Sequence, residues 1–409
     1  MERYNEYKDS GIYFIPDIPK SWQVLKAKYL FKQEKREVRP EDEIVTCFRD
    51  GQVTLRKNRR TEGFTNSMKE IGYQGVRKGD LVIHNMDAFA GAIGVSDSDG
   101  KGTPVYACCT PKRDDINQYY YCYLLRYLAR NGFILSLAKG IRERSTDFRF
   151  NDFKELYLPV PSREEQDAIV SYIDLHSTKI DEAIAQQQKM IDLLNERKQI
   201  IINNAVTKGL NPDAPMKDSG VDWIGEIPEH WMMRRMRYLC KIKTGDKDTI
   251  NRVDEGKYPF YVRSPKVERI NSYTFDGEAV LMAGDGVGAG KVFHYVNGKF
   301  GCHQRVYIFH DIKNINGEYL YFYMKSLFKY TIEQLSAKST VDSVRLNMIQ
   351  DFIVAIPTNE EQTSILSYLH KQIEKFDVAI ANATKQISLL QERKQIIIND
   401  VVTGKVKVC

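Results

Sequence analysis

The chain has 409 residues, of which 42% are hydrophobic and 28% are charged, and its formal net charge is +6. Such a length exceeds what one hydrophobic core usually serves, so we expect two or more domains in a soluble protein of the reducing cytoplasm. The sequence argues against three other classes: no apolar run approaches the ~18 residues of a membrane span, the polar start MERYNEYKDSG is no secretory signal, and the seven scattered cysteines form no zinc motif.

The chain opens with a segment that recurs in its middle. KDSGIYFIPDIPKSW ends at Trp22 and KDSGVDWIGEIPEHW ends at Trp231, so the offset between the two copies is 209 residues. Self-similarity over such a long period predicts a duplicated architecture. We call these stretches the lead-in segments, and we expect each of them to open one half of the molecule.

Residues 23–158 follow the first lead-in segment and have the pattern of an α+β domain. Short strand-type runs (GDLVIHN, AIGVS and PVYACC) are separated by Gly, Asp and Asn, and a helical stretch at 117–133 and the polar loop KGIRERST come after them. This pattern predicts a mixed β-sheet with short helices. The segment holds 24 Lys and Arg against 18 Asp and Glu, a net charge of +6.

A long helix is predicted from about Arg163 to Val206. Ser162 is a suitable N-cap, acidic residues occupy the first turn, and Gly209 ends the helix. The apolar residues follow the narrow stripe that is typical of a coiled coil: Ile169, Ile173, Ile180, Ile184, Ile191, Leu194 and Ile201.

Residues 232–354 repeat the α+β pattern with different letters. Strand-type runs (EAVLMAG, GKVFHYV and RVYIFH) precede a helical stretch at 316–335 and the loop AKSTVDS, and the segment holds 19 Lys and Arg against 13 Asp and Glu, again net +6. The run GDGVGAGK at 284–291 is not a phosphate-binding loop, because its first glycine is displaced and Val292 stands where Ser or Thr is required. We expect a tight turn between two strands there.

A second long helix completes the repeat. PTNEEQTSILSYL (357–369) and LLQERKQIIIN (389–399) match PSREEQDAIVSYI (161–173) and LLNERKQIIIN (193–203) at an offset of 196 residues, and Gly404 ends the helix. Two thin apolar stripes can bury each other, so we predict an antiparallel coiled coil roughly 65 Å long. The second stripe consists of Ile365, Leu369, Phe376, Ile380, Ile387, Leu390 and Ile397.

Positive charge is confined to the two α+β segments, which indicates a polyanion such as double-stranded DNA as the partner of both. Base edges are read by forked side chains such as Arg, Asn and Gln, and phosphates are bound by Lys, Ser and Thr. In the first segment the candidate DNA contacts are Lys57, Arg59, Arg60, Asn66, His84, Asn85, Lys139, Arg142, Arg144, Ser145 and Thr146. In the second they are Arg263, Lys266, Lys291, His303, Gln304, Arg305, Lys338, Ser339 and Thr340.

The charged residues of the repeated helix segments LLNERKQIIIN and LLQERKQIIIN have two interpretations. They form either solvated helix faces or two equivalent docking surfaces for one kind of partner protein. The candidates for docking are Glu196, Arg197, Lys198, Glu392, Arg393 and Lys394. No HExxH, GxSxG or Asn-Pro-Pro-aromatic sequence occurs, and the histidines form no metal-binding pattern. We therefore predict no catalytic residue, no metal site and no cofactor held by this chain.

The order, duplication and spacing of these segments make the chain resemble the specificity subunit of type I restriction–modification systems over essentially its whole length. The resemblance is carried by IPKSW and IPEHW, PSREEQ and PTNEEQ, LLNERKQIII and LLQERKQIII, and VVTGKV. It implies two target recognition domains, each reading half of a bipartite asymmetric DNA site, with a coiled coil that sets the spacer. It also implies two methyltransferase subunits that bind S-adenosylmethionine, and restriction subunits that use ATP and Mg²⁺.

The resulting division places the first lead-in segment and recognition domain at 1–158 and the first long helix at 159–208. The linker, second lead-in segment and second recognition domain take 209–354, and the second long helix and tail take 355–409. Three alternatives stay open at this point. They are the specificity subunit of a type II restriction–methylation enzyme, a stand-alone DNA-binding regulator, and a coiled-coil scaffold with two peptide-binding heads.

Overall fold

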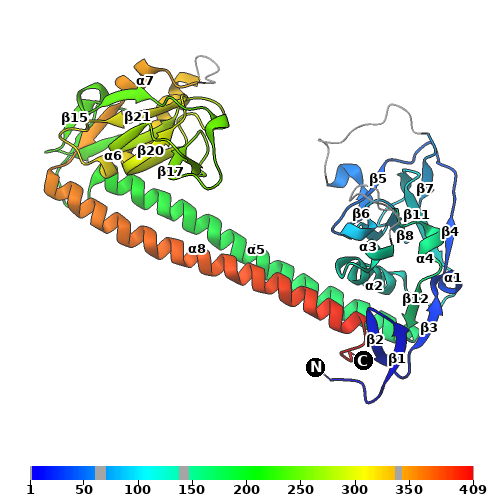
Figure 1. Ribbon diagram of the computed structural model, residues 1–409. Helices are drawn as coiled ribbons and strands as arrows, with labels where there is room; N and C mark the ends of the chain where they lie inside the picture. Colours follow the sequence, from blue (N-terminus) through cyan, green and yellow to red (C-terminus); the bar gives the residue numbers. More distant parts are fainter. Residues whose placement is uncertain (1, 60–70, 138–146, 337–342, 409) are drawn as a thin grey trace. The chain divides into compact units, whose positions relative to one another are not determined.

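The computed structural model describes residues 2–59, 71–137, 147–336 and 343–408, and the chain divides into two compact units. Unit 1 contains Met1–Gln186 and Gln386–Cys409, and unit 2 contains Gln187–Lys385. The two long helices, α5 (Arg163–Lys208) and α8 (Asn359–Val402), each contribute one part to each unit (Figure 1). Each unit therefore combines a β-rich domain with two helix segments that are distant in the sequence.

Unit 1 is built around an antiparallel sheet with the strand order β4-β11-β8-β9. Along β8 the side chains alternate, so that Leu81 and Ile83 face the core under α2 while Val82 joins a smaller core on the opposite face. The strands of this sheet are β4 (Phe31–Glu34), β8 (Leu81–His84), β9 (Ile93–Val95) and β11 (Tyr106–Pro111), and the helix is α2 (Gln118–Arg130).

The remaining elements of unit 1 are short. The lead-in segment forms a hairpin, and three further strand pairs and three short helices complete the domain. The pairs are β1 (Tyr7–Ile12) with β2 (Ile15–Pro19), β3 (Gln23–Lys26) with β12 (Tyr157–Val160), β5 (Val45–Cys47) with β6 (Val53–Leu55), and β7 (Gln74–Val76) with β10 (Gly100–Gly102). The helices are α1 (Ala27–Leu30), α3 (Phe133–Leu137) and α4 (Phe150–Phe153).

Unit 2 contains a larger sheet with the order β16-β21-β19-β20-β17-β18, in which β17 and β20 are parallel and the other pairs are antiparallel. Helix α6 (Gly317–Ser336) contacts β19 and β20. The strands are β16 (Lys241–Thr244), β17 (Tyr258–Tyr261), β18 (Glu268–Ile270), β19 (Phe275–Ala283), β20 (Phe293–Cys302) and β21 (Val306–His310). Two strand pairs, β13 (Met216–Asp218) with β14 (Glu226–Pro228) and β15 (Met232–Arg235) with β22 (Ile353–Ile356), and helix α7 (Leu346–Gln350) complete the unit.

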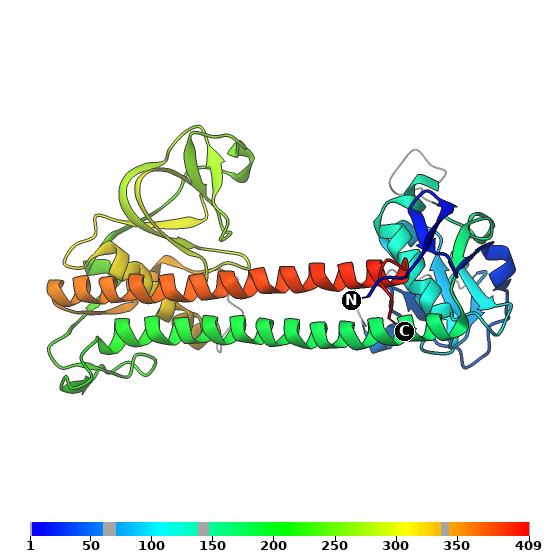
Figure 2. The same ribbon diagram turned by 90° about the horizontal axis from the view of Figure 1, so that it is seen from below.

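The two long helices are antiparallel, as the sequence predicts. In unit 1 the start of α5, with Ile169 and Ile173, shares one core with Val401 and Val402 at the end of α8. In unit 2 the start of α8, with Ile365, shares a core with residues 202–206 at the end of α5. Figures 1 and 2 show the helices running side by side within each unit. The expected fold class, two mixed β/α domains linked by two long antiparallel helices, is confirmed.

The segments that are repeated in the sequence contact one another in unit 1. The indole nitrogen of Trp22 donates to Glu165 at 3.1 Å, which fixes the lead-in segment to the first turn of α5. Gln166 is fully buried, and its Oε1 accepts from the backbone N–H of Asn117 at 2.8 Å, just before α2. The hydroxyl of Tyr120 donates to the carbonyl of Val402 at 3.0 Å. The sequence PSREEQ is thus explained by the contacts that it makes with the domain and with α8.

The same contacts recur in unit 2 between the corresponding residues of the repeat. Trp231 donates to Glu361 at 3.3 Å, and the backbone N–H of Asn316 donates to Gln362 at 2.7 Å. The hydroxyl of Tyr319 donates to the carbonyl of Val206 at 2.9 Å. Because each contact has a counterpart in the other unit, the internal repeat is a repeat of structure as well as of sequence.

Candidate nucleic-acid interface

The two units share one arrangement at the ends of their central strands. In unit 1 the N–H of Asn85, just after β8, donates to the carbonyl of Val105 at 2.9 Å, and the N–H of Phe148 donates to the carbonyl of Asn85 at 3.0 Å. In unit 2 the N–H of Gly284, just after β19, donates to Arg305 at 2.9 Å, and the N–H of Val344 donates to Gly284 at 2.7 Å. We call the surface around these residues, at the end of β8 in unit 1 and at the end of β19 in unit 2, the strand-end surface of each unit. His84, Asn85 and Arg305, predicted from sequence as DNA contacts, all lie on these surfaces.

At the strand-end surface of unit 2, one carboxylate holds two arginines. The Nη1 of Arg263 donates to Oδ1 of Asp285 at 3.0 Å, and the Nη1 of Arg305 donates to Oδ2 of the same residue. The side chain of Asp285 is only 14% exposed. Burial opposes ionisation of Asp285, but the hydrogen bonds from Arg305 and Arg263 outweigh it and lower the pKa of this carboxyl. The pair of guanidinium groups is thus fixed by a single charged anchor.

His303 and Gln304 lie beside this pair. The backbone N–H of Arg305 donates to Nδ1 of His303 at 3.0 Å, and the amide nitrogen of Gln304 donates to Asp248 at 3.0 Å. His303 is buried, and its burial lowers the pKa of the imidazole, so the ring is neutral at neutral pH. His303 therefore supports the loop, while the two arginines are the groups open to a ligand.

The glycine-rich run at 284–291 is the tight turn between β19 and β20 that the sequence predicts. A Cβ at Gly288 would lie 2.4 Å from the carbonyl oxygen of Arg263, and a Cβ at Gly284 would lie 2.8 Å from the ring of Tyr307. The glycines are needed because neighbouring backbone and ring atoms pass so close to them. They bring the loops that carry Arg263, Asp285 and Arg305 together.

The strand-end surface of unit 1 contains a cleft of about 680 Å³. Its lining includes Gln33, Lys35, Asn85, Arg149 and Asn151. The Oδ1 atom of Asn85 is buried and accepts no hydrogen bond from the residues that the structure describes. The cleft thus combines amide side chains (Gln33, Asn85 and Asn151), which can hydrogen-bond a base edge, with two cationic side chains that can bind phosphate.

Sequence reasoning missed the other lining residues of this cleft. A signal for them existed, because Arg149 and Asn151 match Arg345 and Asn347 at the offset of 196 that relates the long helices. His84 is half-buried near the cleft, and burial lowers its pKa despite the nearby carboxylate of Asp87.

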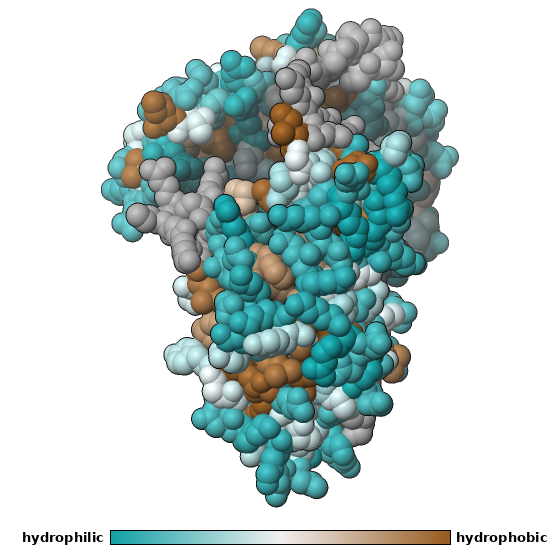
Figure 3. All heavy atoms as spheres, turned by 90° about the vertical axis from the view of Figure 1, so that its right-hand side faces the viewer, coloured by the Kyte–Doolittle hydropathy of each residue, from teal (hydrophilic) through white to brown (hydrophobic). Residues whose placement is uncertain are grey.

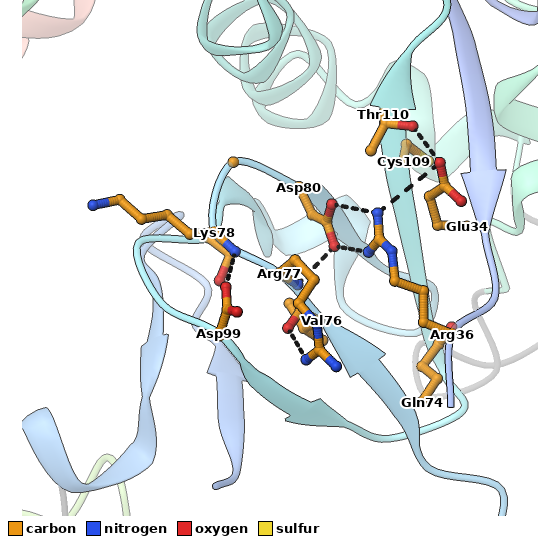
Figure 4. Close-up of polar contacts among 12 residues, drawn as sticks. Glu34, Arg36, Gln74, Val76, Arg77, Lys78, Asp80, Asp99, Cys109 and Thr110 are labelled. Carbon is orange, nitrogen blue, oxygen red and sulfur yellow. Dashed lines mark hydrogen bonds and ion pairs between the residues drawn. The ribbon is translucent and has the colours of Figure 1, made fainter. Parts of the chain in front are cut away.

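Several basic side chains of unit 1 have partners within the protein. Arg36 lies 2.5 Å from Asp80 (Figure 4), and Arg77 lies 3.0 Å from Asp42; both carboxylate side chains are only 2% exposed. Buried carboxylates of this kind need paired cations, so these arginines stabilise the fold. The net charge of the segment therefore overstates the number of cations available to DNA.

Two predicted contacts of unit 1 also have partners. Arg59 lies 2.5 Å from Asp50 and 4.2 Å from the ring centroid of Phe48, and Lys57 pairs with Glu43. In unit 2, Lys266 and Lys291 are exposed and carry charge that can bind phosphate. The remaining predicted contacts lie outside the described residues: Arg60, Asn66, Lys139, Arg142, Arg144, Ser145, Thr146, Lys338, Ser339 and Thr340.

The predicted docking residues divide into two groups. Lys198 lies 2.6 Å from Asp377 in unit 2, and Lys394 lies 2.7 Å from Asp181 in unit 1, so both lysines tie the paired helices together. The Glu and Arg of each repeated helix segment are exposed. The apolar residues next to them, which sequence reasoning missed, are also about half exposed: Leu193 52%, Ile200 51%, Leu389 47% and Ile396 51%.

Metal clusters, disulfides and membrane-spanning helices are all absent from the residues that the structure describes. No group of three or more His, Cys, Asp or Glu in the described residues could hold a metal ion. The six cysteines that the structure describes are free thiols, and five of them are buried. None of the helices, searched over the same residues, is long and apolar enough to cross a membrane. The face drawn in Figure 3 is mostly hydrophilic, with hydrophobic residues in small separate patches.

Comparisons with known proteins agree with this architecture. Residues 228–389 match the family described as type I restriction modification DNA specificity domain. The chain is 30% identical over 181 residues to the type I restriction enzyme EcoDI specificity subunit of Escherichia coli, a match that covers 44% of this chain and 40% of that relative. It is 24% identical over 437 residues to the putative type I restriction enzyme MjaX specificity subunit of Methanocaldococcus jannaschii, which covers 96% of each chain.

Two solved structures share the fold at 15% sequence identity. One is described as the structural basis of complex assembly and conformational transition of the type I R-M system; it has a TM-score of 0.71 and the match covers 95% of this chain and 99% of that one. The other is the HsdS subunit from Thermoanaerobacter tengcongensis, with a TM-score of 0.50 and coverage of 95% and 98%.

Residues 228–389 match the type I DNA specificity domain, and over 96% of its length the chain is similar to the specificity subunit of a type I restriction–modification system. This similarity confirms the resemblance seen in the sequence. It also assigns the chain to the non-catalytic component of such enzymes, as predicted.

Proposed function

We propose that each unit reads one half of a bipartite double-stranded DNA site with its strand-end surface. The observation that carries this proposal is that the two surfaces share one backbone arrangement but differ in their side chains. Unit 1 presents the amide of Asn85 in a cleft, whereas unit 2 presents Arg263 and Arg305. An asymmetric bipartite site has two halves of different sequence, so it requires two equivalent backbone arrangements that carry different base-contacting side chains.

The paired helices then act as the spacer between the two readers. In this proposal residues 1–158 and 209–354 contain the target recognition domains, and residues 159–208 and 355–409 contain the helices. The length of the helices sets the separation of the half-sites, and half-sites about one helical turn apart, ~34 Å, would face the same side of the duplex.

Two methyltransferase subunits are the proposed partners of the helices. Leu193, Glu196, Arg197 and Ile200 share one helical face at spacings of three, four and seven residues, and the same face recurs at 389–396. An apolar pair flanked by charges, present twice, suits two copies of one partner. These subunits would bind S-adenosylmethionine in the cytoplasm, and restriction subunits with ATP and Mg²⁺ would join them.

An exchange of residues 23–158 for the same segment of a relative tests the division of labour. The hybrid is produced with the cognate methyltransferase, and methylated adenines are mapped across the host genome. One half-site should change while the other half-site and the spacer stay the same. If both half-sites stayed the same, or if both changed, unit 1 would not be the reader of one half.

The docking face is tested by replacing Leu193, Ile200, Leu389 and Ile396 with Asp. The variant should lose the co-purifying methyltransferase while its thermal unfolding stays close to that of the parent, because these side chains are exposed. Val378→Asp is the matched control: Val378 is 56% exposed on α8, but its counterpart in the repeat is Glu182. Equal loss of the partner in the control would point to a general effect of added charge.

The DNA-dependent role is separated from a stand-alone regulator by a binding measurement. Phosphate contacts make the affinity for DNA fall steeply as salt rises. We expect sequence-specific binding to strengthen when the methyltransferase is present. Undiminished specific binding without any methyltransferase would favour the regulator.

A further inference from the structure

Asp285 lies at the meeting point of three loops of unit 2. Arg263 follows β17, Asp285 follows β19 and Arg305 precedes β21, so strands that are distant in sequence bring them together. Each oxygen of the carboxylate accepts from Nη1 of one guanidinium group. The backbone of Asp285 also forms an antiparallel bridge with that of Ser343, which holds the loop that carries the carboxylate.

One edge of each guanidinium group, formed by Nε and Nη2, makes no hydrogen bond to the described residues. Over the described residues, no hydrogen bond uses Nε or Nη2 of Arg263 or Arg305. Their side chains are 44% and 62% exposed, whereas the anchoring carboxylate is mostly buried. Each guanidinium group is therefore held at one nitrogen and offers two parallel N–H donors to a ligand.

Two parallel donors match one base edge in the major groove. Guanine presents two neighbouring acceptors, N7 and O6, whereas adenine presents one acceptor next to a donor. Cytosine presents a donor, and thymine presents one acceptor beside a methyl group. The two parallel N–H donors of each arginine have a fixed orientation before DNA binds. They therefore favour guanine, because the guanidinium group cannot rotate toward the acceptors of another base without breaking its hydrogen bond to Asp285.

We propose that Arg263 and Arg305 read guanine bases in the half-site bound by unit 2, and that Asp285 is the positioning residue that aims both side chains. This inference rests on the proposed function and extends it to the bases that unit 2 recognises. Lys266 and Lys291 have a single ammonium group in place of two parallel donors, so in this proposal they bind phosphate and do not discriminate between bases.

The protein contains a matched control for this arrangement. Asp351 also holds two arginines, because Arg235 lies 3.2 Å from its Oδ1 and Arg237 pairs with the same atom. The Nε and Nη2 atoms of Arg237 are used within the protein, on Gln350 and Asp351. Arg235 is the last residue of β15, Arg237 lies in the turn that follows it, and Asp351 lies between α7 and β22, outside the strand-end surface.

The experiment uses the full chain with its cognate methyltransferase subunits, and measures methylation of duplexes in which each position of the second half-site carries every base in turn. The parent should require guanine at one or more positions. Arg263→Lys and Arg305→Lys keep the charge but remove the two parallel donors, so each should lower the preference for guanine roughly 5- to 150-fold at one position. Methylation of the guanine duplex should fall by a similar factor, while methylation of the duplexes with the other bases at that position should change little.

Asp285→Asn should relax the preference at the positions of both arginines and leave the first half-site unchanged, whereas Asp351→Asn should alter no base preference. Thermal unfolding of each variant checks the fold, and the two Lys variants decide the question if Asp285→Asn does not fold. The inference is overturned if the second half-site contains no guanine, if base preference is unchanged, or if the Lys variants weaken all bases equally. Failure of the proposed function would look different, because the parent would then show no bipartite site.

Discussion

The indole nitrogen of Trp22 lies 3.1 Å from a carboxylate oxygen of Glu165, a residue 143 positions further along the chain. Trp231 makes the same contact with Glu361 at 3.3 Å. Both tryptophans are buried, and each also packs beside the glycine that follows the end of the other long helix. The lead-in segments therefore join the start of one helix to the end of the other within each unit.

Gly404→Ala should destabilise unit 1 strongly. Gly404 has φ +75°, and an added Cβ would lie 2.5 Å from Pro19 and 2.8 Å from the ring of Trp22. The left-handed backbone alone costs ~1–2 kcal/mol for alanine, and overpacking against fixed rings adds ~1–3 kcal/mol. Thermal unfolding, with amide exchange over residues 401–404, measures the loss.

Gly11→Ala is the control for that substitution. Gly11 has φ +67°, but nothing lies within 4 Å of its added Cβ, so only the backbone cost applies. Gly209→Ala, with φ +73° and the ring of Trp231 at 3.2 Å, should fall between the two. Equal losses at Gly404 and Gly11 would show that the contact with Trp22 contributes nothing.

Ile173→Ala should cost ~2–5 kcal/mol of the free energy of unfolding, because Ile173 is fully buried between α5, α8 and the domain. Leu175→Ala, on the same helix but 53% exposed, should cost less than ~0.5 kcal/mol. Chemical denaturation of the two variants makes the comparison. A similar cost for both would contradict the burial of Ile173 in the shared core.

Lys394 and Asp181 should show a small favourable coupling. Their atoms lie 2.7 Å apart, but the side chains are 30% and 58% exposed, so the pair is worth only ~0.2–1 kcal/mol. A double-mutant cycle with Lys394→Ala and Asp181→Ala measures it. Lys189→Ala, exposed on α5, replaces Lys394→Ala in the control cycle, which should show no coupling.

The free energy of unfolding should fall as the pH drops below about 6.5. Burial lowers the pKa of His84, His294, His303 and His310, so the folded state keeps these rings neutral while the unfolded chain binds protons near pH 6.5. The stabilisation is therefore complete above that pH and is lost between the unfolded and folded pKa values. His84→Gln should flatten the dependence, and imidazole titration by NMR should place the His84 midpoint below 6.5.

The long helices were predictable because their signals are local. The first was expected at 163–206 and spans Arg163–Lys208, and the expected stop at Gly404 follows a helix that ends at Val402. The extent of burial was less predictable: Ile169 and Ile173 are buried, but Ile191 is only half-buried. Two helices alone cover each other incompletely, and full burial needs the domain that surrounds the ends.

The candidate interface was predictable only in outline. The basic composition indicated a polyanion, but the sequence could not show that Arg36 and Arg77 pair with buried carboxylates while Arg305 shares Asp285 with Arg263. Such pairing depends on which loops the sheet brings together, and no spacing along the chain encodes it. The role of Asp285 therefore became visible only once β17, β19 and β21 were placed.

The dependence of the unit 1 core on Ile397, Val401 and Val402 has a consequence for biosynthesis. The ribosome adds ~5–20 residues per second, so the roughly 200 residues that separate the two parts of unit 1 correspond to about 10 to 40 s of synthesis. Throughout that delay the apolar side chains that await α8 stay uncovered, and the nascent chain is vulnerable to aggregation and proteolysis. Unit 2 has no such delay, so the half made first is the half that matures last.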